Sequence, residues 1–324
     1  MNNSIALHIA IGLALQTHAA FAQNAADYPN RSVRVIVASS PGGGTDLQAR
    51  MFAQKLSDSM KQQFVIDNRP GAGDTIGTGL AVKSPADGYT LLVVSPSFTM
   101  APALYPKFPA DPTKDLTPIS LVVSSPLLLL AHPSLPAKSI KELVALAKTT
   151  PGAMDIGVGP SGTFTHLAAA SFAAAAGIKV TLVPFQDVGQ RYGNAIAGHT
   201  HMLFAPVNAA LPYLKAGRLR ALAVTGSRRS SALPGLNTIA ESGVAGYDVT
   251  TWYGWVAPAG TPAAIVAKLN AELVKAVKLP DIARRLLEDG GEPVGSTAEQ
   301  FAQIIASEIP RWRKATRDAG IRVD

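Results

Sequence analysis

Apolar runs with the length of buried strands alternate with helix-like segments from Tyr28 to the end of the chain. The strand-like runs span residues 32–38, 63–68, 86–94, 154–159, 201–205 and 219–226. Between them lie segments with helical spacing and capping signals, such as Ser139 with Glu142 and Ser296 with Glu299. Strands that alternate with helices predict an α/β architecture with mainly parallel sheets, in which ligands bind beyond the carboxyl ends of the strands.

The N-terminal segment is set apart from this pattern. Residues 1–22 form an apolar stretch that ends in Ala20-Phe21-Ala22, with small residues at the positions that signal peptidase reads. The stretch begins MNNS, without Lys or Arg, and the alternative is a mitochondrial or disordered leader. Because a transit peptide is rich in Arg, we expect a secretory signal cleaved near Ala22 and a mature protein in the periplasm.

Composition removes several kinds of chemistry. The 324 residues include no cysteine, which excludes disulfides, thiol nucleophiles, Cys-based zinc sites and iron–sulfur clusters. There is no His-Glu-x-x-His sequence and no Gly-x-Ser-x-Gly elbow, and His199 and His201 alternate without a nearby carboxylate. We therefore expect no metal, no cofactor and no enzymatic activity. A hydrolase that uses Ser161 with His166 is the remaining enzymatic alternative.

The chain is basic, with a formal net charge of +7. Its densest cationic cluster consists of Lys215, Arg218, Arg220, Arg228 and Arg229. Apolar residues interrupt this cluster in a strand-like pattern, which favours a solvated rim over a nucleic-acid surface. The positive field still favours an anionic small ligand, and we expect no nucleic-acid partner.

A glycine-rich loop follows the first strand-like run. It reads Pro41, Gly42, Gly43, Gly44, Thr45, Asp46 and leads into a helix-like segment. This is the geometry in which backbone N–H groups and the helix dipole meet an anion. No Gly-Lys-Ser/Thr follows, and Leu47 stands where a dinucleotide fingerprint needs its third glycine. We interpret the loop as a carboxylate cradle with Thr45 or Asp46 as helix cap. The alternative is a tight turn without a ligand.

Two further glycine loops, at residues 68–77 and 157–167, also follow strand-like runs and precede helix-like segments. Each alone is weak evidence. Together, the three loops favour a small anionic ligand held by backbone amides and hydroxyls.

Long runs of the chain resemble a known family. They include "YPNRSVRVIVASSPGGGTDLQAR", "NRPGAG", "ADGYTLL" and "WYGWVAPAGTPAAIVAKLNAEL", in the family's order, within a similarity from about Tyr28 to Ile321. The chain resembles the Bug (Bordetella uptake gene) family, the extracytoplasmic solute-binding proteins of tripartite tricarboxylate transporters. The resemblance implies a type II periplasmic binding protein fold, in which two α/β lobes joined by crossing strands close on a ligand. We expect residues 28–124 and 251–324 to form one lobe and residues 125–250 the other.

The resemblance also implies where the ligand binds. Members of the family hold small carboxylates through backbone amides and bridging waters from the first glycine loop and a partner loop in the other lobe. Carried over to this chain, the first loop is 41–46 and the partner loop contributes Ser161, Gly162, Thr163 and His166. Ser95, Pro96 and Ser97 are expected to line the cleft beside the first loop.

The chain departs from the family pattern in several places. Asp74 stands where the family has glycine, and Pro160-Ser161-Gly162-Thr163 replaces a Gly-x-Gly-Ser pattern. Phe185, Gln186 and Asp187 replace the Tyr, Lys and Gly of the family's VPYKG, while His201 and Ala205 each replace an acid. We expect Phe185, Gln186, Asp187 and Ala205 to face the ligand's far end. Phe and Ala in place of Tyr and an acid make this end of the site less polar, and an unpaired polar group of the ligand there would cost about 1–3 kcal/mol. We therefore expect a ligand with one carboxylate and an apolar or aromatic body rather than a citrate-like acid.

The expected function is that of a periplasmic receptor, active as a monomer, which delivers a carboxylate to the membrane subunits of a tripartite tricarboxylate transporter. The alternative partner is a histidine-kinase ectodomain that the ligand-bound form would dock on. The residues do not separate these two partners.

Overall fold

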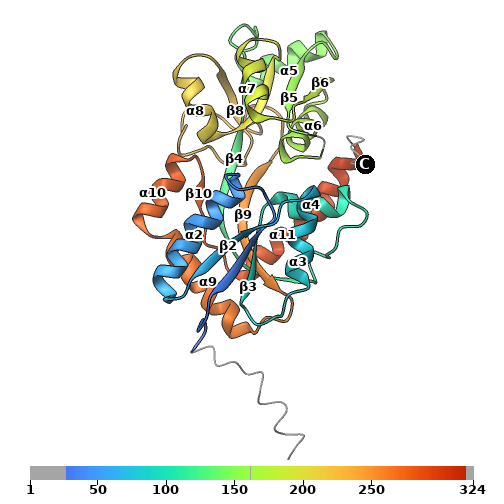
Figure 1. Cartoon of the computed structure of the whole chain (residues 1–324). Coiled ribbons are helices and arrows are strands. Elements are labelled where there is room, and N and C mark those ends of the chain that lie inside the picture. Colours follow the sequence, from blue (N-terminus) through green and yellow to red (C-terminus); the bar gives the residue numbers. More distant parts are fainter. Residues whose placement is uncertain (1–26, 161, 319–324) are drawn as a thin grey trace, which may run out of the picture.

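The computed structural model describes residues 27–160 and 162–318, which form two α/β lobes (Figure 1). The predicted two-lobed α/β architecture is thereby confirmed. The expected secretory signal, residues 1–22, lies outside the described residues. Within the described part of the chain, no helix is long and apolar enough to cross a membrane.

The lower lobe in Figure 1, lobe 1, is built on a sheet with the strand order β2-β1-β3-β9-β4-β10. The strands β1 (Val33–Val37), β2 (Phe64–Asn68) and β3 (Thr90–Val94) are parallel. The other three strands each run antiparallel to their neighbours: β9 (Thr250–Pro258), β4 (Leu116–Ala131) and β10 (Glu292–Pro293). The helical segments of lobe 1 are α2 (Gly44–Met60), η2 (Ala72–Asp74), α3 (Thr75–Val82), α4 (Pro96–Leu104), α9 (Ala263–Val277), α10 (Pro280–Glu288) and α11 (Ala298–Asp318).

The upper lobe, lobe 2, has the strand order β8-β4-β7-β5-β6. Its parallel strands are β5 (Asp155–Val158), β6 (Thr181–Pro184) and β7 (Met202–Pro206), and β8 (Arg220–Val224) pairs with the opposite edge of β4. The helices of lobe 2 are α5 (Ile140–Thr149), α6 (Phe164–Ala176), α7 (Val188–Ile196) and α8 (Val207–Lys215).

The strand β4 belongs to both sheets. Its residues 116–126 pair with β9, and from Leu127 onward it pairs with β7 and β8. Beside this switch the Leu127 N–H donates to Thr225 Oγ1 at 2.8 Å, where the chain leaves β8 to return to lobe 1. We propose the division of the chain into 28–124 with 251–324 and 125–250, which places one boundary inside β4 and the other at the first residues of β9.

Alternation along the strands builds a core on both faces of each sheet. Val33, Val35 and Val37 pack on one side of the lobe 1 sheet, and Ile36 packs on the other. In the second half of β4, Leu129 and Leu130 likewise face different clusters. Helices cover both faces of each sheet, so side chains on both faces are buried. The strands therefore appear in the sequence as continuous apolar runs.

The capping signals are confirmed at one helix and wrong by one residue at another. Ser139 Oγ accepts from the Glu142 N–H at 3.2 Å at the start of α5. At α11, however, Thr297 Oγ1 and Gln300 exchange the two capping bonds. The Ser296 hydroxyl instead accepts from the Leu121 N–H of β4, so tertiary contact takes this side chain away from the cap.

The last helix, α11, joins the two cores. Phe301 is buried in lobe 1, whereas Trp312 is 1% exposed and belongs to the core of lobe 2. The Trp312 ring lies edge-to-face against Phe164 at the start of α6, with 6.0 Å between ring centroids. Its Nε1 donates to Glu308 Oε2 at 3.3 Å.

We predict that Trp312→Ala lowers the free energy of unfolding by about 3–5 kcal/mol, because it removes a fully buried aromatic ring. Trp312→Phe keeps a ring and loses one hydrogen bond, so it is expected to cost about 1–2 kcal/mol. Urea denaturation measures both. Equal losses in the two variants would show that the ring does not hold α11 to lobe 2.

Candidate functional site

The first glycine loop connects the end of β1 to α2, and hydrogen bonds to the buried carboxylate of Asp46 hold it in place. Gly42 has φ +80°, a left-handed conformation that favours glycine, and its N–H donates to Asp46 Oδ2 at 2.8 Å. The same carboxylate accepts from Arg50 Nε and Asn68 Nδ2, both at 2.9 Å. Although burial acts in the opposite direction, these bonds hold the pKa of Asp46 below its ordinary value.

Two expectations about this loop are corrected. Gly43 is the N-cap of α2, rather than Thr45 or Asp46, because the backbone leaves the helical region there. Asp46 is only 1% exposed, with its carboxylate turned inward on the loop, so its side chain shapes the cradle and does not face the cleft.

The second loop, between β5 and α6, repeats this geometry. Gly162 has φ +79°, and its N–H donates to His166 Nδ1 at 3.0 Å, four residues ahead as at Gly42 and Asp46. Thr163 is the N-cap with φ −72° and ψ 160°, against −72° and 164° at Gly43. Accepting this bond requires an unprotonated Nδ1, and burial lowers the pKa of His166 accordingly. Ser161 lies outside the described residues.

Both loops present unused donors. The first intrahelical bonds run from the Leu47 N–H to Gly43 O and from the Leu167 N–H to Thr163 O. The N–H groups of residues 44–46 and 164–166 therefore precede the first helical bond, and none has an acceptor within residues 27–160 and 162–318. Each set lies at the positive end of a helix dipole, which suits an anion.

A third loop of lobe 1, between β3 and α4, carries a chain of polar side chains. The Ser95 and Ser97 hydroxyls are 2.8 Å apart, and Ser97 Oγ donates to Asp74 Oδ2 at 2.5 Å. Pro96 is buried, so its ring packs inward. Asp74 follows β2, on the other side of β1, and reaches Ser97 because its segment folds across the end of β1. A Cβ on Gly77 would lie 2.7 Å from that of Ala38.

A cavity of about 130 Å³ lies between the two lobes, where the β3–α4 loop faces the β5–α6 loop, and the predicted residues 41–46 of the first glycine loop are not among the residues that line it. It is lined by Gly73, Ser97, Met100, Leu104, Tyr105, Gly162 and Thr163. The structure thus places the predicted Ser97 opposite the predicted Gly162 and Thr163. Met100, Leu104 and Tyr105 were not predicted, because their apolar spacing along α4 is that of an ordinary core helix.

Phe185, Gln186 and Asp187 lie at the end of the edge strand β6 and do not line this cavity. Asp187 is an exposed N-cap whose carboxylate accepts from the Gln190 N–H at 3.0 Å. Phe185 packs beside Gly157, where an added Cβ would lie 3.3 Å from its ring. Contact of these residues with the ligand stays a prediction.

Of the two positions at which the chain replaces a family acid, Ala205 was expected to face the ligand, and its side chain does not. Ala205 is 0% exposed, because alternation along β7 turns its side chain into the core behind the sheet. His201 precedes β7, at the end of the sheet away from the loops, and pairs with Asp155 at 3.0 Å. The replacement of the family's acid by His201 therefore does not act on the ligand directly.

Two unpredicted residues support the loops. Arg191 of α7 is 6% exposed and donates from Nη1 to Thr165 Oγ1 at 3.2 Å. Its Nε is buried without a hydrogen-bond partner among the described residues. Tyr253 of β9 packs under the first loop, since a Cβ on Gly44 would lie 2.4 Å from its hydroxyl. Neither residue has a signal in the sequence, because both depend on contacts between distant segments.

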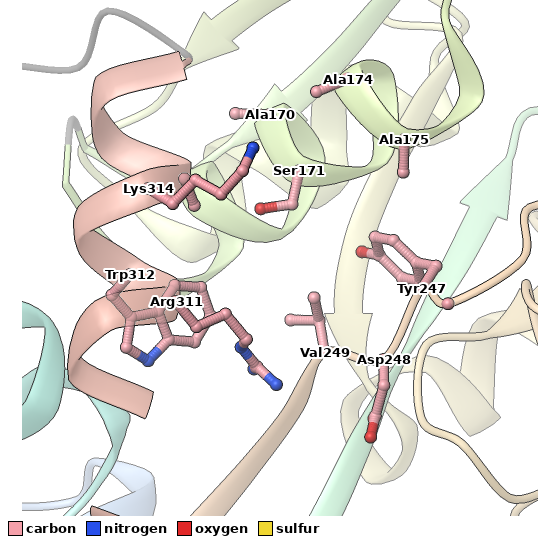
Figure 2. Close-up of a pocket in the computed structure, with 12 residues that line it drawn as sticks. Ala170, Ser171, Ala174, Ala175, Tyr247, Asp248, Val249, Arg311, Trp312 and Lys314 are labelled. Atoms are coloured by element: carbon pink, nitrogen blue, oxygen red, sulfur yellow. The ribbon is translucent and has the colours of Figure 1, made fainter. Parts of the chain in front are cut away.

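A larger cavity of about 440 Å³ lies between α6, α11 and residues 246–249 (Figure 2). Figure 2 shows Tyr247, Asp248 and Val249 facing Arg311 and Trp312 of α11. None of the three glycine loops lines it. We propose the smaller cavity as the candidate site, because it lies between the lobes and is lined by Ser97, Gly162 and Thr163, which follow the carboxyl ends of the parallel strands β3 and β5.

We predict that His166→Asn, which keeps an acceptor for the Gly162 N–H, removes a pH dependence. The folded pKa of His166 is depressed, so below about pH 6.5 the unfolded chain gains a proton that the folded loop resists. The wild type should therefore lose stability relative to His166→Asn between pH 7.5 and 5.5, by no more than about 1.4 kcal/mol, which is the linkage limit for one group titrating one unit below its unfolded pKa. Thermal unfolding measures this difference. His199→Asn, at an exposed histidine, is the control. An equal response in both variants would contradict the role of His166 as the acceptor that holds Gly162.

Comparisons with known proteins agree with this geometry. A family model described as the tripartite tricarboxylate transporter family receptor (TctC) matches residues 48–321. Protein BugT of Bordetella pertussis is 34% identical over 324 residues, covering 99% of each chain. The structure of R. palustris Rpa4515 with adipate has a TM-score of 0.79 at 35% identity, covering 92% of this chain and 100% of that one. MatC of Rhodopseudomonas palustris with bound malate has a TM-score of 0.75 at 30% identity, covering 89% and 99%.

These matches confirm the resemblance to the Bug family and the type II binding-protein fold. The chain belongs to the tripartite tricarboxylate transporter receptor family of periplasmic solute-binding proteins.

Proposed function

We propose that this protein captures a small carboxylate between its lobes and delivers it to the membrane subunits of a tripartite tricarboxylate transporter. The observation that carries the proposal is the pair of equivalent loops at the strand ends of the two lobes, each offering N–H groups at a helix N-terminus. Rpa4515 and MatC, which share this fold, were solved with adipate and malate, both carboxylates.

The mechanism follows from the position of the donors. A carboxylate that reaches both loops links lobe 1 to lobe 2, so the closed form is stabilised by the ligand's interactions with both lobes. The closed form is then what the membrane subunits recognise. Residues 1–22 act as the export signal that brings the receptor to the periplasm, where it works as a monomer.

The walls of the cavity favour a ligand with an apolar part. Met100, Leu104 and the ring of Tyr105 supply apolar surface in lobe 1. Phe185 does not line the cavity but follows β6 in lobe 2, and its aromatic ring is proposed to meet the ligand's far end. We therefore propose an acid with one carboxylate and an apolar or aromatic body.

A thermal-shift screen of the mature chain against carboxylic acids and their neutral amides tests the proposal. An acid at one hundred times its dissociation constant should stabilise the fold by about 2.7 kcal/mol. The matching amide should give no shift, because it brings no negative charge to the helix N-termini. Stabilisation by amides as strong as that by acids, or by no acid at all, would contradict carboxylate capture.

A further inference from the structure

Asp74 is held beside the interlobe cavity without a cation. Its backbone is left-handed, with φ 65°, and the preceding Gly73 packs so closely on the Tyr105 ring that a Cβ there would lie 1.9 Å away. The residue is partly exposed but its carboxyl group is buried, and its neighbours Gly73 and Ser97 line the cavity. The second oxygen, Oδ1, accepts no hydrogen bond from any described residue, and no described cation pairs with the group.

The Asp74 carboxylate determines in which direction the hydroxyls of Ser97 and Ser95 donate their protons. Burial raises the pKa of Asp74 to about 6, against the opposing effect of the Ser97 bond, so at pH 7.5 the group is mainly ionised and accepts only. The Ser97 proton is committed to Asp74 Oδ2. In the Ser95–Ser97 contact, Ser95 is then the donor, which commits its proton as well. Neither hydroxyl then has a proton left to donate, and Ser97, which lines the cavity, presents only lone pairs to it.

One other titratable group faces this corner from lobe 1, and its hydroxyl can both donate and accept. Tyr105 is the titratable neighbour in lobe 1, and burial together with Asp74 raises its pKa, which keeps the phenol neutral. Across the cavity, lobe 2 offers backbone donors of the second loop, with His166 and Arg191 behind it. Apart from the Tyr105 phenol, the acceptors Ser97 and Asp74 on the lobe 1 side thus face backbone donors on the lobe 2 side.

We propose that Asp74, acting through Ser97 at the cavity wall, selects ligands that carry a hydrogen-bond donor, a hydroxyl or ammonium group, in addition to a carboxylate. The inference rests on the carboxylate receptor function proposed above and names its substrate class as hydroxy- or amino-carboxylates. The carboxylate binds the N–H groups of the loops, and the donor group meets the acceptors of lobe 1. A second carboxylate at this corner would face ionised and lone-pair oxygens and be disfavoured.

Two sets of acids with matched skeletons test the proposal by calorimetry at pH 7.5. One set is succinate, malate and aspartate. The other is 3-phenylpropanoate, 3-phenyllactate and phenylalanine. Within a set, only a hydrogen, a hydroxyl or an ammonium group differs. The wild type should bind the better donor-bearing acid of a set at least about tenfold tighter than the acid without a donor, which corresponds to about 1.4 kcal/mol.

Asp74→Gly is the test variant, because glycine accepts the left-handed backbone and frees the Ser97 proton. The tenfold preference should fall below about threefold. Lys61→Gly is the matched control, since Lys61 is an exposed left-handed residue at the end of α2 and away from the cavity. It should keep the wild-type preference.

The outcomes separate the two proposals. Equal or tighter binding of succinate and 3-phenylpropanoate by the wild type, or a preference that survives Asp74→Gly, overturns the role of Asp74 and leaves carboxylate capture standing. If none of the six acids binds but another carboxylate stabilises the fold in the thermal-shift screen, the inference about Asp74 fails alone, and if no carboxylate does, the receptor function fails with it.

Discussion

The pairing of β4 with both sheets is the constraint on which the rest of the structure depends. A single 16-residue strand changes partners between Pro126 and Leu127, so the two lobes share a hydrogen-bonded backbone where they meet. Antiparallel pairing to β9 on one side and β7 on the other fixes the register of each sheet. It thereby sets where the parallel strands of each lobe end, and both glycine loops lie at such ends.

The two loops show how one backbone geometry can rest on different side chains. In each, a left-handed glycine donates to a side chain four residues later, which turns the following helix N-terminus outward. Lobe 1 uses an ionised carboxylate held by Arg50 and Asn68, whereas lobe 2 uses a neutral imidazole. The buried guanidinium of Arg191 adds positive charge behind the second loop only. The lobe 2 side of the cleft is therefore the more favourable side for an anion, and Asp74 makes the lobe 1 side less so.

Much of the fold could be predicted from the sequence because its signals are local. Apolar runs, glycines before helices and the Ser139 cap each depend on a few neighbouring residues, and the structure agrees with them. The roles of single side chains were harder to predict. Ala205 and Pro96 were assigned to the right segments but point into the core, since a position at a strand end does not determine the direction of the side chain.

The contacts that shape the cavity were beyond local reasoning. Ser97 meets Asp74 only because β2 and β3 flank β1 and the intervening segment folds across its end. Arg191 and Tyr253 reach the loops from α7 and β9, far along the chain. The cap of α11 shows the same effect. Thr297 caps the helix because the hydroxyl of the neighbouring Ser296 accepts a hydrogen bond from the Leu121 N–H of β4. Tertiary contacts decided each of these positions.

A crystal structure of the protein with the tightest-binding acid tests the central claim most directly, because it shows which N–H groups the carboxylate oxygens contact. We predict a ligand in the cavity between Ser97 and Thr163, with its carboxylate on N–H groups of both the first and the second glycine loop. A ligand seated in the larger cavity beneath α11, or one held by a single lobe, would contradict the account.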